Sequence, residues 1–370
     1  MPEADLKPRL AAWLADRRPD WQDVSIDALR LDHGGGWSAD IFILDASSQQ
    51  GSHRVQHALV VRRQGGAFEL VLGGELELQA KVMAALGRHP SVHAPALIGV
   101  ELDPDLLGAP FLVMERVAGH AATQAPNYNV SGWLADMNPE QRHGCWLQGI
   151  QGFAALHRID WHDGFRFLDR SERGEPGLDQ YLRYLTEWYE WAAQGRPQPI
   201  IEKAMDYLLR ARPQNAEVSV LWGDATPSNT LFRPDGSVAA LIDWELATLG
   251  PGEIDLAWWL YFDELFSTGF GVARLAGLPD RDESISIYES AVGRRVNHMD
   301  YYDILTGVRM AIVCVRQFDR QVSLGNIAAN NVSMTNNLMT CHLARRLGLP
   351  EPEMGDDFKA FLGGHIHKET

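Results

Sequence analysis

The polar residues best placed to do chemistry lie at the two ends of one predicted hairpin. Residues 230–233 and 238–242 are short apolar runs, and the Pro-Asp-Gly-Ser segment between them has the chemistry of a tight turn. Asp224 and Asn229 precede the first run, and Asp243 follows the second. Because a hairpin returns the chain to its start, we expect Asn229 and Asp243 to lie close together. Their side-chain oxygens suit Mg²⁺, which keeps several waters and binds phosphates.

The spacing of these three residues fits a phosphoryl-transfer site. In the protein kinase template, a catalytic-loop Asp precedes a metal-binding Asn by five residues, and a second metal-binding Asp follows the next strand. Asp224, Asn229 and Asp243 reproduce this spacing and order. An Asp followed five residues later by an Asn also occurs by chance in ordinary loops, where both residues are common. The flanking apolar runs and the Ile-Asp-Trp-Glu segment that follows favour the site over the loop.

The elements that must position these residues change character along the chain. Up to about residue 115, short apolar runs such as 39–44, 57–62 and 110–115 alternate with glycine-rich turns, and one helix is predicted over 75–86. After residue 135 the periodicity is mostly helical, as in 139–157 and 178–193. A short apolar run at 218–221 leads into the hairpin. The simplest interpretation is a β-rich lobe followed by a larger helical lobe.

Composition limits the classes of function. The chain has 370 residues, 45% of them hydrophobic, which predicts about two globular domains. A net charge of −16 disfavours nonspecific binding to nucleic acid. The three cysteines have neither metal-ligand spacing nor a disulfide framework, and no apolar stretch is long enough to span a membrane. Without the apolar run of a signal peptide at its start, the sequence predicts a cytoplasmic protein.

Residues 221–258 read LWGDATPSNTLFRPDGSVAALIDWELATLGPGEIDLAW. This segment resembles the signature of the aminoglycoside phosphotransferase/choline kinase-like family, part of the protein kinase-like superfamily. The similarity is to the branch whose kinase domains are linked to acyl-CoA dehydrogenases. Residues 110–119 (PFLVMERVAG) are similar to the lobe-connecting segment of that family, and residues 153–160 (FAALHRID) to one of its helix ends. The resemblance covers residues 30–320.

The resemblance implies an α+β, protein kinase-like bilobal fold, with a small β-rich N-lobe carrying one main helix and a larger, mostly helical C-lobe. The predicted boundaries are 1–115 for the nucleotide-binding lobe, 116–350 for the lobe with the catalytic loop and acceptor site, and 351–370 for a tail. The implied activity moves the γ-phosphate of ATP or GTP to a hydroxyl of a small molecule. Asp224 would be the base, Asn229 and Asp243 would hold Mg²⁺, and the backbone of Met114, Glu115 and Arg116 would meet the nucleotide base.

The sequence departs from the family pattern at two places. Trp222 stands where the family has His, and we expect catalysis to survive because an indole fills the volume and donates one hydrogen bond. The phosphate-binding lysine has no counterpart in the first lobe. Arg62 on the matching strand is the candidate, since a guanidinium keeps the charge and binds phosphate through two donors. Strand alternation then turns Arg63 towards water.

Three further predictions concern supporting residues. In the family, a glutamate of the first-lobe helix forms an ion pair with the basic residue, and its position corresponds to Gln79 in this sequence. We therefore predict that Glu75, one turn earlier on the same face, takes this role. The alternative is that these are ordinary solvated helix residues. A glycine run would cover the nucleotide phosphates with backbone amides, although three glycines also make an ordinary turn. Its residues are Gly34, Gly35, Gly36 and Ser38. We expect Asp255 to pin the catalytic loop and His157 to brace it.

The sequence leaves the acceptor open. An aminoglycoside, a hydroxy acid and a hydroxyacyl thioester are all compatible with it. Two other functions also stay open: a nucleotide-binding pseudokinase that acts through partner proteins, and transfer of a nucleotidyl group. Aromatic residues of the second lobe would either line the acceptor pocket or fill the core. They are Trp188, Tyr189, Trp191, Trp258, Trp259 and Tyr261.

Overall fold

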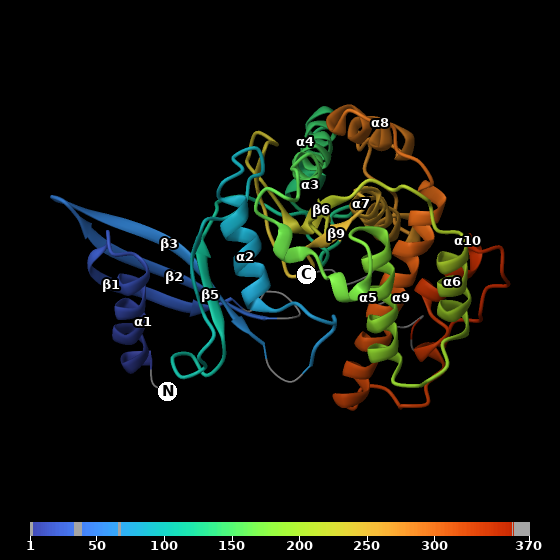
Figure 1. Cartoon of the computed structure of the whole chain (residues 1–370), viewed down its shortest axis with the longest axis horizontal. Helices are drawn as coiled ribbons and strands as arrows, with labels where there is room; N and C mark the ends of the chain where they lie inside the picture. Colours follow the sequence, from blue (N-terminus) through green and yellow to red (C-terminus); the bar gives the residue numbers. More distant parts are fainter. Residues whose placement is uncertain (1–2, 33–38, 66–67, 357, 359–370) are drawn as a thin grey trace. The chain divides into compact units, whose positions relative to one another are not determined.

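The computed structural model describes residues 3–32, 39–65, 68–356 and 358. The chain forms two compact units, Met1–Ala118 and Gly119–Thr370, which Figure 1 shows in the blue-to-teal and the green-to-red parts of the colour scale. The mixed α+β architecture predicted from the sequence is confirmed, with a sheet in the first unit and mainly helices in the second. Within the described residues, no helix is both long enough and apolar enough to cross a membrane.

The first unit is built on a five-stranded antiparallel sheet with strand order β1-β2-β3-β5-β4. The β2–β3 hairpin is its longest pairing, running without a break from Ala39 opposite Gln64 to Gln50 opposite His53. Strand β3 then pairs with β5, which places Arg62 opposite Leu112. The strands are β1 (Gln22–Leu31), β2 (Ala39–Gln50), β3 (His53–Gln64), β4 (Leu97–Glu101) and β5 (Phe111–Glu115).

Two helices complete this unit. Helix α2 (Leu76–Leu86) confirms the helix predicted over 75–86, except that Glu75 is its N-cap rather than its first residue. Helix α1 (Glu3–Arg17) is additional to the expected elements, and it places Leu10 and Leu14 in the core against the sheet. Pro8 lies inside this helix, and a proline in a helix interior usually argues against a helix, so the sequence signal is weak there.

The second unit is mainly helical, with two small antiparallel ladders, β6–β9 and β7–β8. Helix α9 contacts α5, α6, α7 and α10, and it is the longest helix among the described residues (Figure 1). The helices are α3 (Trp133–Asp136), α4 (Pro139–His157), α5 (Leu178–Ala193), α6 (Pro199–Arg210), α7 (Glu253–Phe266), α8 (Arg281–Val292), α9 (Met299–Ser323) and α10 (Leu338–Arg346). The strands are β6 (Ser219–Leu221), β7 (Thr230–Phe232), β8 (Val238–Leu241) and β9 (Thr248–Gly250).

The elements nearest the predicted site form where the sequence places them. Helices α4 and α5 have the predicted bounds, and α4 begins with a capping box in which Asn138 and Gln141 satisfy each other's backbone N–H groups. Strands β7 and β8 pair antiparallel, confirming the hairpin. Its turn contains Gly236 at a φ of +85°, a conformation that glycine adopts without steric cost.

Candidate active site

The β7–β8 hairpin brings its two ends together. The Ile242 N–H donates to the carbonyl oxygen of Asn229 over 2.9 Å, so Asn229 and Asp243 are neighbours, as expected. Asp243 has a φ of +62°, in the left-handed region that few residues other than glycine occupy. Strain of this kind persists only where the surrounding structure enforces it, and it concentrates at functional sites.

The Asp224 carboxylate lies in the same place and is held at both of its oxygens. Oδ1 accepts a hydrogen bond from Trp258 Nε1 over 2.7 Å, and Oδ2 accepts one from Asn229 Nδ2 over 2.6 Å. Burial, opposed by the positive charge of Arg309 and assisted by the negative charge of Asp243, raises the pKa of Asp224 to about 6. The residue keeps some accessible surface, but protein surrounds its carboxylate. The carboxylate is therefore fixed in position and partly desolvated.

Asn229 and Asp243 fit a magnesium site. Asn229 donates through Nδ2 to Asp224, an orientation that turns its Oδ1 away from that carboxylate and leaves the oxygen available for a cation. The Asp243 carboxylate adds a second oxygen from the other end of the hairpin. Among the described residues, no group of three or more His, Cys, Asp and Glu side chains gathers in a metal-binding arrangement. Two protein oxygens are typical for Mg²⁺, which completes its shell with water and substrate phosphates.

A buried brace supports this loop from behind. Asp255 is 0% exposed and accepts hydrogen bonds from the backbone N–H groups of Trp222 and Gly223, at 2.7 and 3.0 Å. His157 Nε2 lies 3.0 Å from the same carboxylate, and its Nδ1 lies 2.7 Å from the Tyr288 hydroxyl. Asp255 therefore pins the loop and His157 orients Asp255, the arrangement expected for both. Trp222 donates from Nε1 to the carbonyl of Ile242 over 2.9 Å, so the indole that replaces histidine also bonds to the hairpin.

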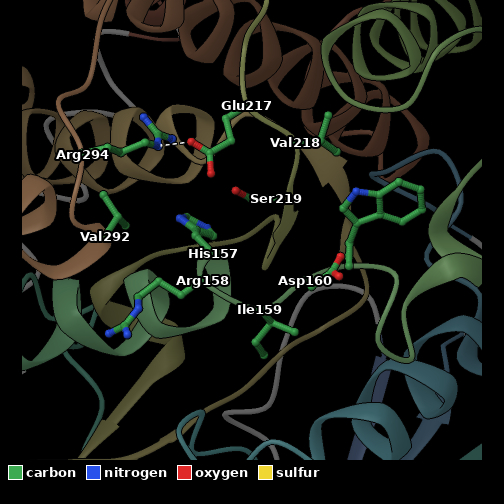
Figure 2. A pocket seen from close by; sticks show the side chains of 10 residues that line it. His157, Arg158, Ile159, Asp160, Glu217, Val218, Ser219, Val292 and Arg294 are labelled. Atoms are coloured by element: carbon green, nitrogen blue, oxygen red, sulfur yellow. Dashed lines mark ion pairs between the residues drawn. The ribbon is translucent and has the colours of Figure 1, made fainter.

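The pocket drawn in Figure 2 lies on the far side of this brace. It has a volume of about 460 Å³ and a polar lining that includes His157, Arg158, Ser219 and the Glu217–Arg294 ion pair of 2.7 Å. Asp224, Asn229 and Asp243 are not among its lining residues. This pocket is therefore distinct from the place where a phosphoryl group would be transferred.

In the first unit, Arg62 and Arg63 occupy opposite faces of β3. Arg62 is 7% exposed, whereas the Arg63 side chain is one-third exposed and pairs with Asp40 over 2.6 Å. This is the alternation expected for them. Arg116, just beyond β5, forms an ion pair of 2.8 Å with Asp45. Met114 and Glu115 end β5 itself.

The predicted partner of Arg62 has a different placement from the one expected. Glu75 is exposed and has an extended backbone as the N-cap of α2, so it does not lie on the helix face as assumed. Within the described ranges, no hydrogen bond or ion pair joins Glu75 to Arg62, and a nucleotide-site role for Glu75 stays a prediction. Gln79, one turn later, is buried. The predicted phosphate-covering residues Gly34, Gly35, Gly36 and Ser38 lie outside the described residues.

Two residues at the site were not assigned to it from the sequence. Trp258 was expected only as a pocket wall or core residue, yet it holds the Asp224 carboxylate. Arg309 is 2% exposed, and its guanidinium carbon lies 3.8 Å from the centre of the Trp258 ring. The signal for Arg309 is its position on α9, where a charged side chain interrupts a long buried stripe. A charge at a core position is uncommon unless it is paired or functional.

Comparison with known proteins identifies the family. Residues 31–284 match the sequence model of the phosphotransferase enzyme family known as APH. The chain belongs to this family. Its curated relatives include the Arabidopsis thaliana protein named probable acyl-CoA dehydrogenase IBR3, which is 26% identical over 86% of this chain and 40% of its own length. Another is acyl-CoA dehydrogenase family member 10 of Mus musculus, 23% identical over 93% of this chain and 30% of its own length. This chain thus spans less than half of either relative.

Solved structures of similar fold include several phosphotransferases. A protein from Ralstonia eutropha JMP134, named as a candidate aminoglycoside phosphotransferase, matches with a TM-score of 0.63 and 22% identity, covering 92% of this chain and 94% of its own. Plasmodium vivax ethanolamine kinase matches with a TM-score of 0.57 and 14% identity, covering 87% and 82%. At these identities the matches confirm the kinase-like fold of the family member.

Proposed function

We propose that this phosphotransferase moves the γ-phosphoryl group of ATP or GTP to the hydroxyl of a small molecule. The acceptor oxygen attacks the γ-phosphorus, the bond from that phosphorus to the bridging oxygen of the nucleotide breaks, and the nucleoside diphosphate leaves. The hydroxyl proton passes to Asp224. Family membership supports phosphoryl transfer as the class of reaction. The residues at the hairpin ends support transfer to a hydroxyl with Asp224 as the base.

The observation that carries the proposal is the placement of the Asp224 carboxylate. Two side-chain N–H groups fix it, from Trp258 and Asn229, so its direction towards an incoming hydroxyl is set before the acceptor binds. A raised pKa of about 6 also makes this carboxylate a better proton acceptor than an ordinary aspartate, while it stays mostly ionised at pH 7. Both properties are those required of a general base.

The remaining roles are those that the resemblance to the family implies. Asn229 and Asp243 would hold Mg²⁺, which would neutralise charge on the nucleotide phosphates. Arg62 would contribute a further positive charge for the phosphates, and residues 114–116 would meet the nucleotide base. Gly34, Gly35, Gly36 and Ser38 are proposed to cover the phosphates.

The test is a transfer assay with an Asp224 variant. Purified full-length protein is incubated with ATP or GTP, Mg²⁺ and a panel of hydroxylated acceptors, and products are identified by mass. We expect Asp224→Ala to lower turnover by about 10²–10⁴-fold while nucleotide binding persists. Asp235→Ala, in the exposed turn of the same hairpin, is the control and should leave turnover unchanged. Full turnover in Asp224→Ala would contradict the assignment of the base.

The same assay separates the two other candidate functions. Products that gain AMP rather than phosphate would indicate nucleotidyl transfer. Nucleotide binding without transfer to any acceptor, in wild type and variant alike, would favour the pseudokinase. The bonded arrangement of Asp224, Asn229 and Trp258 supports the enzyme over the pseudokinase, because an unused site is under no requirement to keep a buried carboxylate.

A further inference from the structure

Arg309 is a buried cation with two guanidinium nitrogens that no hydrogen bond satisfies within the described residues. It lies in the middle of α9 and is 2% exposed, and its Nε and Nη1 atoms have no hydrogen-bond partner among the residues that the structure describes. Thr306, one turn earlier on the same face, also has a buried hydroxyl without a partner there. Burying a charge or an N–H group without a partner destabilises a fold, so an arginine in this state requires an explanation.

The surroundings of Arg309 connect it directly to the proposed base. Its guanidinium stacks on the Trp258 ring at 3.8 Å, and Trp258 Nε1 donates to Asp224 Oδ1 over 2.7 Å. A single indole ring therefore separates the guanidinium from the carboxylate. On the α5 side, Arg309 opposes the rise that burial causes in the pKa of Tyr181 and of Tyr184. The cation thus lies among aromatic rings within reach of the reacting position, and all of these residues belong to the same unit.

The stacking contact does not use the donors of the guanidinium. A cation over an aromatic face gains electrostatic attraction from the ring, but the N–H groups in the guanidinium plane still need acceptors. Asp224 accepts from Trp258 and Asn229, and no hydrogen bond joins it to Arg309 in the described part of the chain. The unused donors point to an acceptor group that is not part of the protein.

A second buried arginine on the same helix, Arg316, differs from Arg309 in its partners. Arg316 lies two turns beyond Arg309, is 9% exposed, and stacks on Trp191 at 4.3 Å. Unlike Arg309, it pairs with a carboxylate, that of Asp319, over 3.2 Å. The two arginines share their helix, burial and aromatic stacking, and they differ in that a carboxylate pairs directly with Arg316. Arg316 is therefore a matched control for Arg309.

We propose that Arg309 determines acceptor specificity by binding an anionic oxygen of the acceptor. This inference rests on the proposed function, with the acceptor hydroxyl directed at Asp224. The preferred acceptor then carries a hydroxyl and an anionic group, such as a carboxylate, joined by a short carbon chain. A guanidinium with unsatisfied N–H groups attracts an anionic oxygen, and it repels an ammonium group. The site therefore selects against cationic acceptors of similar size.

The test compares acceptors that differ only in charge. The acceptors are 3-hydroxybutyrate and 4-hydroxybutyrate, the carboxamide of each, and the amino alcohol of each length. The proteins are full-length wild type, Arg309→Lys, Arg309→Met and Arg316→Met. Values of kcat and KM are measured with saturating ATP and Mg²⁺, and the thermal midpoint of each protein is measured with each acceptor alone. The second measurement does not depend on phosphoryl transfer.

We expect wild type to prefer at least one carboxylate over its carboxamide by about 30-fold or more in kcat/KM, as for other buried charge-assisted contacts. Arg309→Met should reduce this ratio to about one, mainly through KM, because the lost contact is one made on binding. Arg309→Lys should keep an intermediate ratio, since the ammonium retains the charge without the planar fork. Arg316→Met should keep the wild-type ratio.

Three results would overturn the proposal. The first is that, for wild type, neither kcat/KM nor the thermal midpoint is higher with a carboxylate than with its carboxamide. Another is Arg309→Met that keeps the wild-type ratio. The third is a kcat that falls equally for all acceptors in Arg309→Met, which would make Arg309 a counter-charge for Asp224 only. If none of these acceptors is phosphorylated, the thermal shifts still decide whether Arg309 binds an anion, and the wider acceptor panel used with Asp224→Ala decides the proposed function. If Arg309→Met does not fold, Arg309→Lys and Arg309→Gln replace it in both measurements.

Discussion

Asp224 is placed where catalysis and stability make opposite demands. Its carboxylate is useful as a base because protein surrounds it and two donors fix it, and the same surroundings disfavour its charge. The pKa rises to about 6 from the usual 3.8. Since the folded protein holds the proton to a higher pH than the unfolded chain does, ionising Asp224 costs folding free energy.

This conflict predicts the pH dependence of stability in Asp224→Asn. Well below pH 4 the aspartate is protonated in both states, so its raised pKa has no effect. Between about pH 3 and 6 it ionises first in the unfolded chain, and stability is lost as pH rises. The asparagine variant does not titrate. We therefore expect its stability to improve relative to wild type by about 2 kcal/mol between pH 4 and pH 8.

Urea denaturation of both proteins at pH 4, 5, 6 and 8 measures this difference. Asp235→Asn provides the control, because its neighbour Ser237 lowers the pKa of Asp235. The stability that a lowered pKa contributes is lost only below the usual pKa of an aspartate, so the difference between wild type and this variant should stay nearly constant from pH 5 to pH 8. A stability difference between wild type and Asp224→Asn that is constant over this range would show that Asp224 does not carry the burial cost.

At the scale of elements, the short loop between β6 and β7 depends on one glycine. Gly223 has a φ of +85°, and a Cβ added there would lie 2.0 Å from the carbonyl oxygen of Leu246. Gly195 is the matched control, with a φ of +76° and nothing within 4 Å of an added Cβ. Gly195→Ala should cost about 1–2 kcal/mol for its conformation alone.

Gly223→Ala should cost several kcal/mol more than Gly195→Ala, because the clash with backbone must displace the loop that carries Asp224. Thermal unfolding of both variants, followed by circular dichroism, makes the comparison. Equal losses in the two variants would mean that the loop has room to move, and that the close approach to Leu246 does not hold it.

The Asp255 brace gives a second prediction at this scale. Asp255→Asn keeps the shape of the side chain but provides only one acceptor oxygen for two buried backbone N–H groups. We expect it to lose about 2–4 kcal/mol of stability, together with phosphoryl transfer, because a buried donor is left unpaired next to the catalytic loop. Tyr288→Phe removes only the outer hydroxyl from His157 and should lose about 1 kcal/mol. Urea denaturation measures both losses. A larger loss in Tyr288→Phe than in Asp255→Asn would contradict the central role of Asp255 in holding the loop.

The sequence predicted those features of the fold that depend on residues close together in the chain. Helices α4 and α5 were predicted with correct bounds, and each strand of the β7–β8 hairpin to within one residue, because their periodicity and turn residues act within a few positions. The stacking of Arg309 on Trp258 was not predictable, since it joins two helices that only the tertiary fold brings together. Helix α2 begins one residue later than predicted, so Glu75 is its N-cap and does not lie on the helix face.

At the scale of the whole molecule, metal-dependent nucleotide binding should appear as stabilisation of the full chain. A ligand that binds only the folded state stabilises it by about 2.7 kcal/mol at a hundred times its dissociation constant. We expect ATP or GTP to raise the thermal midpoint of wild type in the presence of Mg²⁺, and to raise it much less with EDTA. Asp243→Asn should lose this metal dependence, because an amide oxygen is a weaker ligand than a carboxylate for a hard cation.

The hairpin itself supplies the control that makes this experiment interpretable. Asp243→Asn preserves the left-handed backbone at φ +62°, since asparagine adopts that conformation more readily than most residues. Asp235→Asn makes the same chemical change in the exposed turn at the other end of the strands. A metal-dependent shift kept in Asp235→Asn and lost in Asp243→Asn assigns the metal to the hairpin ends. A shift that is equal in wild type and both variants would place the metal elsewhere, and no shift with either nucleotide would contradict nucleotide binding in the absence of an acceptor.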